Sequence, residues 1–168
     1  MKQVNTYKLT LIAMLAAIAI IGRIAVSTIP NVQPVTDIII LAGIFLGAVP
    51  AMMLACVVVF VSNAVLGMGI WSVWQVVCWG LIGLLSSLLS RPMHRFGLYL
   101  LVPFSILCGY LFGLLISLPT YQVTGSFWAY YILGLPFDTN HAIGNGVIML
   151  FIYPVMAYLI NKYKGNHL

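Results

Sequence analysis

The chain of 168 residues is 63% hydrophobic and 5% charged, with a mean hydropathy of +1.13. Soluble globular domains carry about 25% charged residues, so this composition excludes that class and indicates a chain embedded in a lipid bilayer. The formal charge of +5 arises from seven Lys and Arg against two Asp. These cations stand near predicted helix ends rather than in one patch, which argues against a nucleic-acid binder. Two widely separated carboxylates also disfavour paired acid–base catalysis.

Six membrane-spanning helices are predicted. A spanning helix takes about 20 apolar residues, so six occupy roughly 120 positions and leave no room for a separate soluble domain. We therefore expect residues 1–168 to form a single all-α transmembrane domain. Few charges separate the apolar stretches, so Pro and Gly divide them; Gly47-Ala48-Val49-Pro50 is one such turn-like sequence. The predicted spans are 8–28, 36–48, 50–67, 72–90, 97–118 and 139–161.

The positions of the cations predict both termini on the cytoplasmic side of the membrane. Cytoplasmic loops close to spans are enriched in Lys and Arg. If 36–67 were one long helix, the chain would have five spans, and Arg91 and Arg95 would lie opposite Lys2 and Lys8. Six spans place six of the seven cations on one side, with Arg23 alone near the outer side: Lys2, Lys8, Arg91, Arg95, Lys162 and Lys164.

Amide and aromatic side chains gather in the three connections predicted on the outer side, at 29–36, 67–71 and 119–138. The inner connections are short or basic and lack this mixture. The outer end is therefore the predicted mouth of a ligand site. The residues concerned are Asn31, Gln33, Trp71, Trp74, Gln75, Tyr130, Tyr131 and Phe137.

Three charged residues near the outer side allow two interpretations each. Arg23 either extends its charge to the interface or joins a structural ion pair, or it pairs with Asp37 or with an anionic group of a ligand. Asp37 and Asp138 each follow a proline, Pro34 and Pro136. Each could cap the free amide groups at a helix start, or bind a ligand by hydrogen bonds.

Trp71 and Gln75 are four residues apart and share a helix face, which would pair an aromatic wall with an amide. An interfacial belt of aromatic side chains is the alternative for Trp71. Trp79 lies deeper in the predicted span and is expected to pack in the core.

Asn63, His141 and Asn145 lie within or at the start of apolar segments, so we expect them to face the interior of the bundle. His141 and Asn145 are four residues apart. They either form hydrogen bonds between helices or contact a ligand. A metal site is not predicted, because the other two histidines are assigned to the opposite side.

Ala13 and Ala17 lie one turn apart in the first span, and small residues at this spacing let another helix approach closely. The approaching helix belongs either to this chain or to a partner subunit.

A small chain with six predicted spans, this alanine pair and a polar, aromatic outer mouth resembles the substrate-binding S component of an energy-coupling-factor (ECF) vitamin transporter. The resemblance covers essentially the whole chain. It rests on Ala13 and Ala17, on residues 30–37, on Ser62-Asn63 with 71–75, and on Gly134-Leu135-Pro136-Phe137-Asp138 followed by His141 and Asn145.

The resemblance implies that the chain binds one micronutrient from outside. It further implies association with a transmembrane coupling subunit and two cytoplasmic ATPases, and toppling in the membrane to release the ligand inside. Ala13 and Ala17 would then contact the coupling subunit. ATP hydrolysis is expected in the partners, because this sequence contains no phosphate-binding loop.

The outer segments look most like the cobalamin branch of this family, so cobalamin is the predicted ligand, with no permanently bound cofactor. Corrinoid amides would meet Asn31, Gln33, Gln75 and Asn145. The flat ring would meet Trp71, Tyr130, Tyr131 or Phe137, and His141 is a candidate axial ligand of cobalt. Pantothenate or another small vitamin is the alternative.

Two other classes of function are weaker. An intramembrane enzyme would rest on Asp138 and His141 alone. An assembly scaffold would explain the alanine pair but not the outer amides and aromatics.

Overall fold

The computed structural model describes residues 6–167, except the side chains of residues 7, 120–124, 161 and 163–167. The described part is helical and contains no strand. Its helices are α1 (Thr6–Ala25), α2 (Val35–Leu46), α3 (Ala48–Leu66), α4 (Ile70–Leu88), α5 (Ser90–Phe96), α6 (Leu98–Thr124) and α7 (Phe127–His167).

Five of these helices, α1, α3, α4, α6 and α7, are long and apolar enough to cross a bilayer, as expected of a multi-pass membrane protein. The exception among the apolar helices is α2, with 12 residues. At 1.5 Å per residue it rises about 18 Å, well short of the roughly 30 Å hydrocarbon core. Every residue of α2 is buried, so α2 is the central element around which the longer helices pack.

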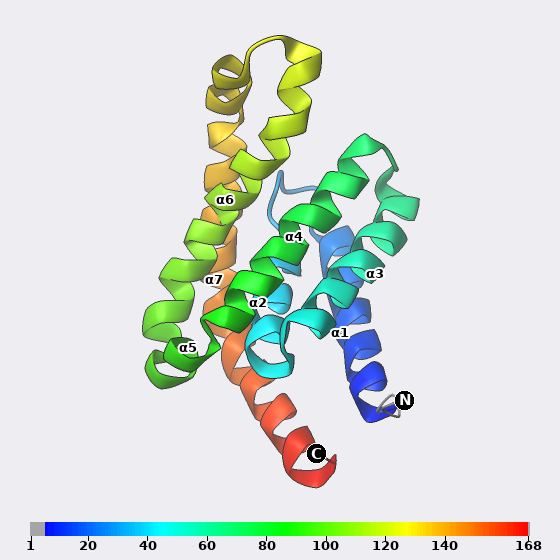
Figure 1. Ribbon diagram of the computed structural model, residues 1–168, viewed down its shortest axis with the longest axis vertical. Helices are drawn as coiled ribbons and strands as arrows, with labels where there is room; N and C mark the ends of the chain where they lie inside the picture. Colours follow the sequence, from blue (N-terminus) through cyan, green and yellow to red (C-terminus); the bar gives the residue numbers. More distant parts are fainter. Residues whose placement is uncertain (1–5, 168) are drawn as a thin grey trace.

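Apart from the short α5, which lies at the turn between α4 and α6, successive helices run in alternating directions, so α1 begins and α7 ends at the same end of the molecule (Figure 1). The three connections predicted to share the outer side lie toward the opposite end. The six-span count and the cytoplasmic termini stay predictions. Lys2 lies outside the described residues, as does the side chain of Lys164.

The predicted boundaries of α2, α3 and α4 are within two residues of those observed. Gly47 and Gly67 end α2 and α3 with φ of 97° and 112°, a left-handed conformation that favours glycine. The break predicted at 47–50 therefore occurs at Gly47 alone, and Pro50 lies in the first turn of α3.

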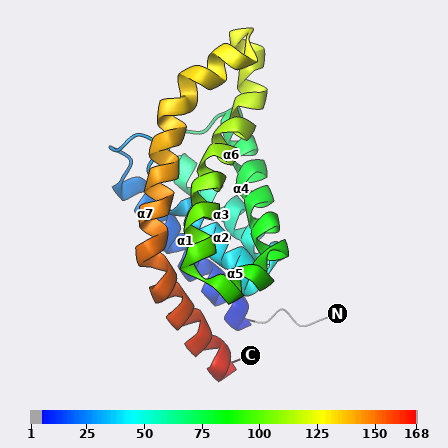
Figure 2. The same ribbon diagram turned by 90° about the vertical axis from the view of Figure 1, so that its left-hand side faces the viewer.

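The prediction of a long outer loop at 119–138 is wrong. Residues 98–124 and 127–167 are helical, and only Gly125 and Ser126 separate α6 from α7. Pro119 and Pro136 lie inside these helices. Proline removes one backbone donor and bends a helix, but membrane helices tolerate it. The resulting α6–α7 hairpin runs side by side and projects beyond the other outer connections (Figures 1 and 2).

Close contacts at glycines hold the bundle together. A Cβ added at Gly43 of α2 would lie 2.8 Å from Ser86 Cβ of α4. A Cβ at Gly109 of α6 would lie 2.7 Å from Ala142 Cα of α7. These approaches leave no space for a larger residue, so α2 against α4 and α6 against α7 are fixed at short separation.

Candidate functional site

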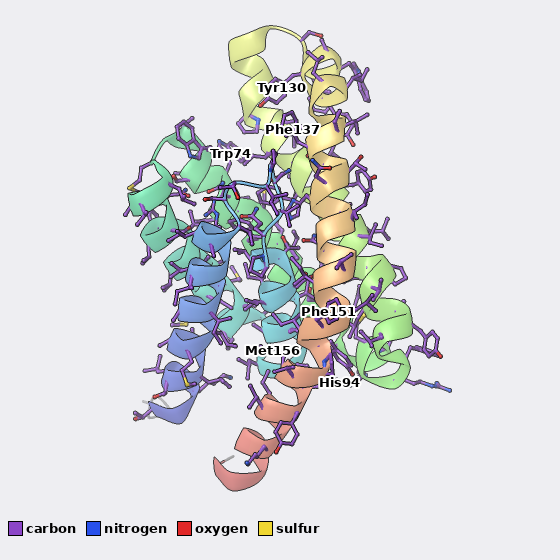
Figure 3. The ribbon with its side chains drawn as sticks, turned by 180° about the vertical axis from the view of Figure 1, so that it is seen from behind. Trp74, His94, Tyr130, Phe137, Phe151 and Met156 are labelled. Atoms are coloured by element: carbon purple, nitrogen blue, oxygen red, sulfur yellow. The ribbon has the colours of Figure 1, made fainter. Side chains whose placement is uncertain are left out.

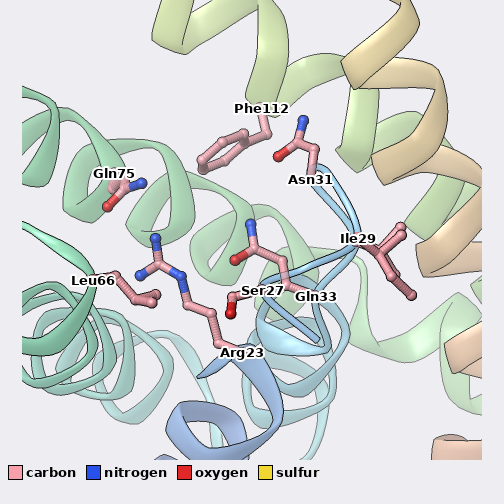
Figure 4. Close-up of a pocket in the computed structure, with 9 residues that line it drawn as sticks. Arg23, Ser27, Ile29, Asn31, Gln33, Leu66, Gln75 and Phe112 are labelled. Atoms are coloured by element: carbon pink, nitrogen blue, oxygen red, sulfur yellow. The ribbon is translucent and has the colours of Figure 1, made fainter. Parts of the chain in front are cut away.

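A cavity of about 290 Å³ opens between the end of α1, the 26–34 link and helices α3, α4 and α6. We call it the Arg23 cavity. The sequence predicted three of its residues, Asn31, Gln33 and Gln75. The full lining is Arg23, Ser27, Ile29, Asn31, Val32, Gln33, Leu66, Gln75 and Phe112 (Figure 4).

Arg23 is the single charged residue of this lining and is only 9% exposed. Its Nη1 donates to Ser62 Oγ at 2.6 Å, and its guanidinium carbon lies 5.2 Å from the centre of the Trp79 ring. The pair with Asp37 is not formed, because neither oxygen of that carboxyl group has a hydrogen-bond partner. The cavity therefore presents a buried cation with no carboxylate in its lining.

Gln75 is held in place by its neighbours. Asn63 Nδ2 donates to Gln75 Oε1 and to Ser72 Oγ, each at 2.8 Å. Asn63 is 1% exposed and does not line the cavity. Its role is to orient Gln75, which presents a fixed carboxamide to the cavity. Figure 4 shows the Gln75 and Gln33 side chains on either side of the Arg23 guanidinium.

Asn31 joins the 26–34 link to α7. It adopts a φ of 61°, which asparagine tolerates better than most residues, and its Nδ2 donates to the carbonyl oxygen of Phe137 at 3.0 Å. The link is thereby tied over the cavity against the α6–α7 hairpin.

Phe112 separates the cavity from a buried chain of polar groups. Its ring centre lies 4.9 Å from that of Trp79 and 5.2 Å from that of His141. Trp79 Nε1 donates to Thr36 Oγ1 at 3.0 Å, and Thr36 Oγ1 is 2.8 Å from His141 Nε2. Trp79 is fully buried, as predicted, and it also carries a hydrogen bond within the core.

Asp37, His141 and Asn145 are buried and do not line the Arg23 cavity. Asn145 Nδ2 donates to the carbonyl oxygen of Ser105 at 3.1 Å, so Asn145 and His141 form the predicted hydrogen bonds between helices. The predicted cap at Asp37 is wrong. Pro34 is the N-cap of α2, no side chain caps it, and Asp37 lies in the first helical turn with both oxygens unpartnered.

A family model described as "ECF transporter, substrate-specific component" matches residues 7–161. The chain belongs to this family. No curated protein and no solved structure gave a significant match. Members of this family are substrate-binding subunits of membrane transporters rather than catalysts, and the apolar helices agree with a multi-pass membrane location.

The aromatic side chains predicted at the mouth of the S component do not line its cavity. Trp71 and Phe137 are exposed, and the Trp71 ring lies against Gly69. Tyr131 stacks on Phe127 at 5.9 Å. Figure 3 shows Tyr130 toward the tip of the α6–α7 hairpin, with Trp74 at the same end of the molecule. Trp74 is half-buried and is absent from the cavity lining.

Asp138 is also outside the cavity of the S component. It was predicted to cap a helix or to bind a ligand, and the cap is wrong because α7 begins at Phe127. The Asp138 carboxyl group packs directly against Gly113 of α6. His141 bonds to Thr36 and its Nδ1 has no partner, so no hydrogen bond links it to Asp138 as an enzyme site would require.

Ala13 and Ala17 are exposed on α1, beside the exposed side chains of Met14 and Ile18. In the described part of the chain, no other helix covers either alanine. The small-residue pair is therefore on an outward face, where a partner subunit can approach.

Sequence reasoning left several cavity residues of the S component out of the site. Arg23 carried a signal, as the lone cation predicted on the outer side, but was left between two interpretations. Phe112, Leu66 and Ser27 lie in stretches without a distinguishing pattern. Only the packing of α1, α3 and α6 shows that they meet.

Proposed function

We propose that this S component binds a small, carboxylate-bearing vitamin in the Arg23 cavity. The observation that carries the proposal is a buried guanidinium in a cavity whose lining holds amides and no carboxylate. Arginine recognises carboxylates through charge-assisted and often bidentate hydrogen bonds. Gln33, Gln75 and Asn31 would add amide contacts, and Phe112 an apolar wall.

The size of the cavity supports a small ligand. About 290 Å³ is close to the lower limit of typical ligand pockets, which span roughly 300–1,000 Å³. Pantothenate carries one carboxylate, an amide and two hydroxyl groups on a short chain, so its groups match the cation and the amides. It is the ligand that we favour.

Cobalamin, predicted from the outer segments, is the second candidate. The observations that favour it are the amides at the mouth and the α6–α7 hairpin, which carries Tyr130 toward its tip (Figure 3). A corrinoid is larger than the cavity. Its binding would need the 26–34 link and the hairpin to separate.

For transport, we propose that the S component spans the membrane six times with both termini in the cytoplasm of a bacterial cell. It would associate with a coupling subunit and two ATPases and topple to release its ligand inside. The exposed Ala13 and Ala17 on α1 support a docking face for the coupling subunit.

Equilibrium binding of a vitamin panel to the purified chain tests the proposal. We expect saturable binding of pantothenate at a stoichiometry of one, and no binding of vitamins that lack a carboxylate. Binding of cobalamin but not of pantothenate would overturn the ligand that we favour and select the second candidate. If no member of the panel binds, the assignment as a vitamin-binding subunit is wrong.

A further inference from the structure

Behind Phe112, buried polar atoms of three side chains have no hydrogen-bond partner. These atoms are both carboxyl oxygens of Asp37, Nδ1 of His141 and Oδ1 of Asn145. The three residues are 0% exposed. Most buried polar groups in proteins are paired, and each unpaired one requires an explanation.

The three residues belong to α2 and α7, which pack against each other and against α6. His141 and Asn145 are one turn apart on α7, so they share a face. Both face α6, since His141 contacts Phe112 and Asn145 bonds to the carbonyl oxygen of Ser105. Asp37 follows Thr36, the partner of His141, in the first turn of α2.

Three of these four atoms are oxygens, whereas Nδ1 of His141 donates or accepts a hydrogen bond depending on its tautomer. The carboxylate oxygens of Asp37 and the amide oxygen of Asn145 accept hydrogen bonds and cannot donate. Burying an unpaired carboxylate is strongly unfavourable unless a partner compensates it. A group that binds the three unpartnered oxygens would bring hydroxyl or N–H donors.

Phe112 is the partition between this cluster and the Arg23 cavity. Its side chain lines the cavity and also contacts His141 and Trp79. Rotation of this one ring away from His141 would expose the cluster to the cavity. A ligand could then place its carboxylate at Arg23 and its other end at Asp37.

We propose that Asp37, His141 and Asn145 form a second subsite, behind Phe112, that binds the hydroxyl or N–H donors of the transported vitamin. This inference rests on the proposed function. It divides recognition between two ends of the ligand: Arg23 selects the carboxylate, and the Asp37 subsite selects the donors. Specificity within the class of carboxylate vitamins would then come from the second subsite.

The test compares pantothenate with its analogue in which both hydroxyl groups are replaced by hydrogen. Isothermal titration of the purified full chain gives the two dissociation constants. A hydrogen bond to a charged group strengthens binding by more than a bond between neutral groups. We therefore expect the wild type to prefer pantothenate by at least about tenfold. Asp37→Asn replaces the carboxylate with a carboxamide of the same shape, so one acceptor oxygen becomes an NH2 donor. We expect this variant to lose most of the preference by weakening the binding of pantothenate alone.

Arg23→Gln is the matched control, because it should weaken both ligands equally and leave the preference intact. Thermal unfolding of each ligand-free variant checks that it folds, and Asn145→Ala repeats the test if Asp37→Asn does not fold. Full preference retained in the folded subsite variant would overturn the second subsite and leave the proposed function standing. A wild-type chain that binds neither compound would overturn both.

Discussion

Arg23 is the residue on which the proposed site depends. A buried charge is stable only with partners, and Arg23 has the Ser62 hydroxyl and the face of the Trp79 ring. A guanidinium has five N–H donors, more than one hydroxyl oxygen can accept. A carboxylate in the cavity would accept hydrogen bonds from the remaining N–H donors. Ligand binding would therefore also stabilise the buried charge of Arg23.

Trp79 links the Arg23 cavity to the core through its hydrogen bond to Thr36. Trp79→Phe keeps an aromatic ring but removes this bond and part of the buried volume. We expect it to lower the free energy of unfolding by at least about 1 kcal/mol. Denaturation of the detergent-solubilised chain measures the change. Trp71→Phe, at an exposed position, is the control and should stay within about 0.5 kcal/mol of the wild type. Equal effects of the two substitutions would disprove the role of the Thr36 bond.

At this scale the sequence indicated the residue types of the site but not their depth. Asn31, Gln33 and Gln75 line the cavity as predicted. Asp37, His141 and Asn145 were left between ligand binding and a structural role, and they lie behind Phe112. The sequence indicates on which turn of a helix these residues lie. It does not show that the Phe112 ring, from α6, separates them from the cavity.

Among the elements, the α6–α7 hairpin departs most from expectation. Boundaries of α2 to α4 could be predicted because glycines with positive φ end α2 and α3. The hairpin could not, because Pro119 and Pro136 were taken as helix ends. Their missing backbone donors are tolerated where the neighbouring helix supports the structure. Contact between α6 and α7 at Gly109 and Ala142 is part of that support.

Glycine substitutions test this packing with one chemical change at two positions. In Gly109→Ala the new methyl group would lie 2.7 Å from Ala142 Cα, so backbone must move. We expect a loss of about 1–3 kcal/mol in the free energy of unfolding. Gly134 of α7 has no atom within 4 Å of an added Cβ. Gly134→Ala should therefore be neutral or stabilise the helix by up to about 1 kcal/mol. Thermal unfolding in detergent compares the two variants with the wild type. If Gly109→Ala is as stable as Gly134→Ala, the close approach of α6 and α7 is contradicted.

For the whole molecule, the ligand site and the proposed docking face lie in different places. The Arg23 cavity is bounded by the 26–34 link, whereas Ala13 and Ala17 are earlier on α1 and face outward. Composition and charge predicted a membrane protein and the face that carries the amides. They could not show that α2 is a short central helix, since its burial arises from the packing of all the others.

Separation of the two regions predicts that binding and transport can be uncoupled. Ala13→Trp adds a large side chain to the α1 face without contacting the cavity. We expect normal ligand affinity in the purified chain but at least about tenfold slower uptake by cells that contain the complete transporter. Leu107→Trp, at an exposed position on α6, is the control and should transport normally. Normal uptake by Ala13→Trp, together with normal assembly, would show that α1 is not the docking face.

The central claim, that Arg23 binds the carboxylate of the transported vitamin, is tested most directly by titrating pantothenate and panthenol into the wild type and Arg23→Gln. Panthenol has an alcohol in place of the carboxylate. We predict that the wild type prefers pantothenate by at least about tenfold, as expected for a charge-assisted hydrogen bond, and that Arg23→Gln loses this preference. An equal preference in both proteins, with Arg23→Gln correctly folded, would contradict the account.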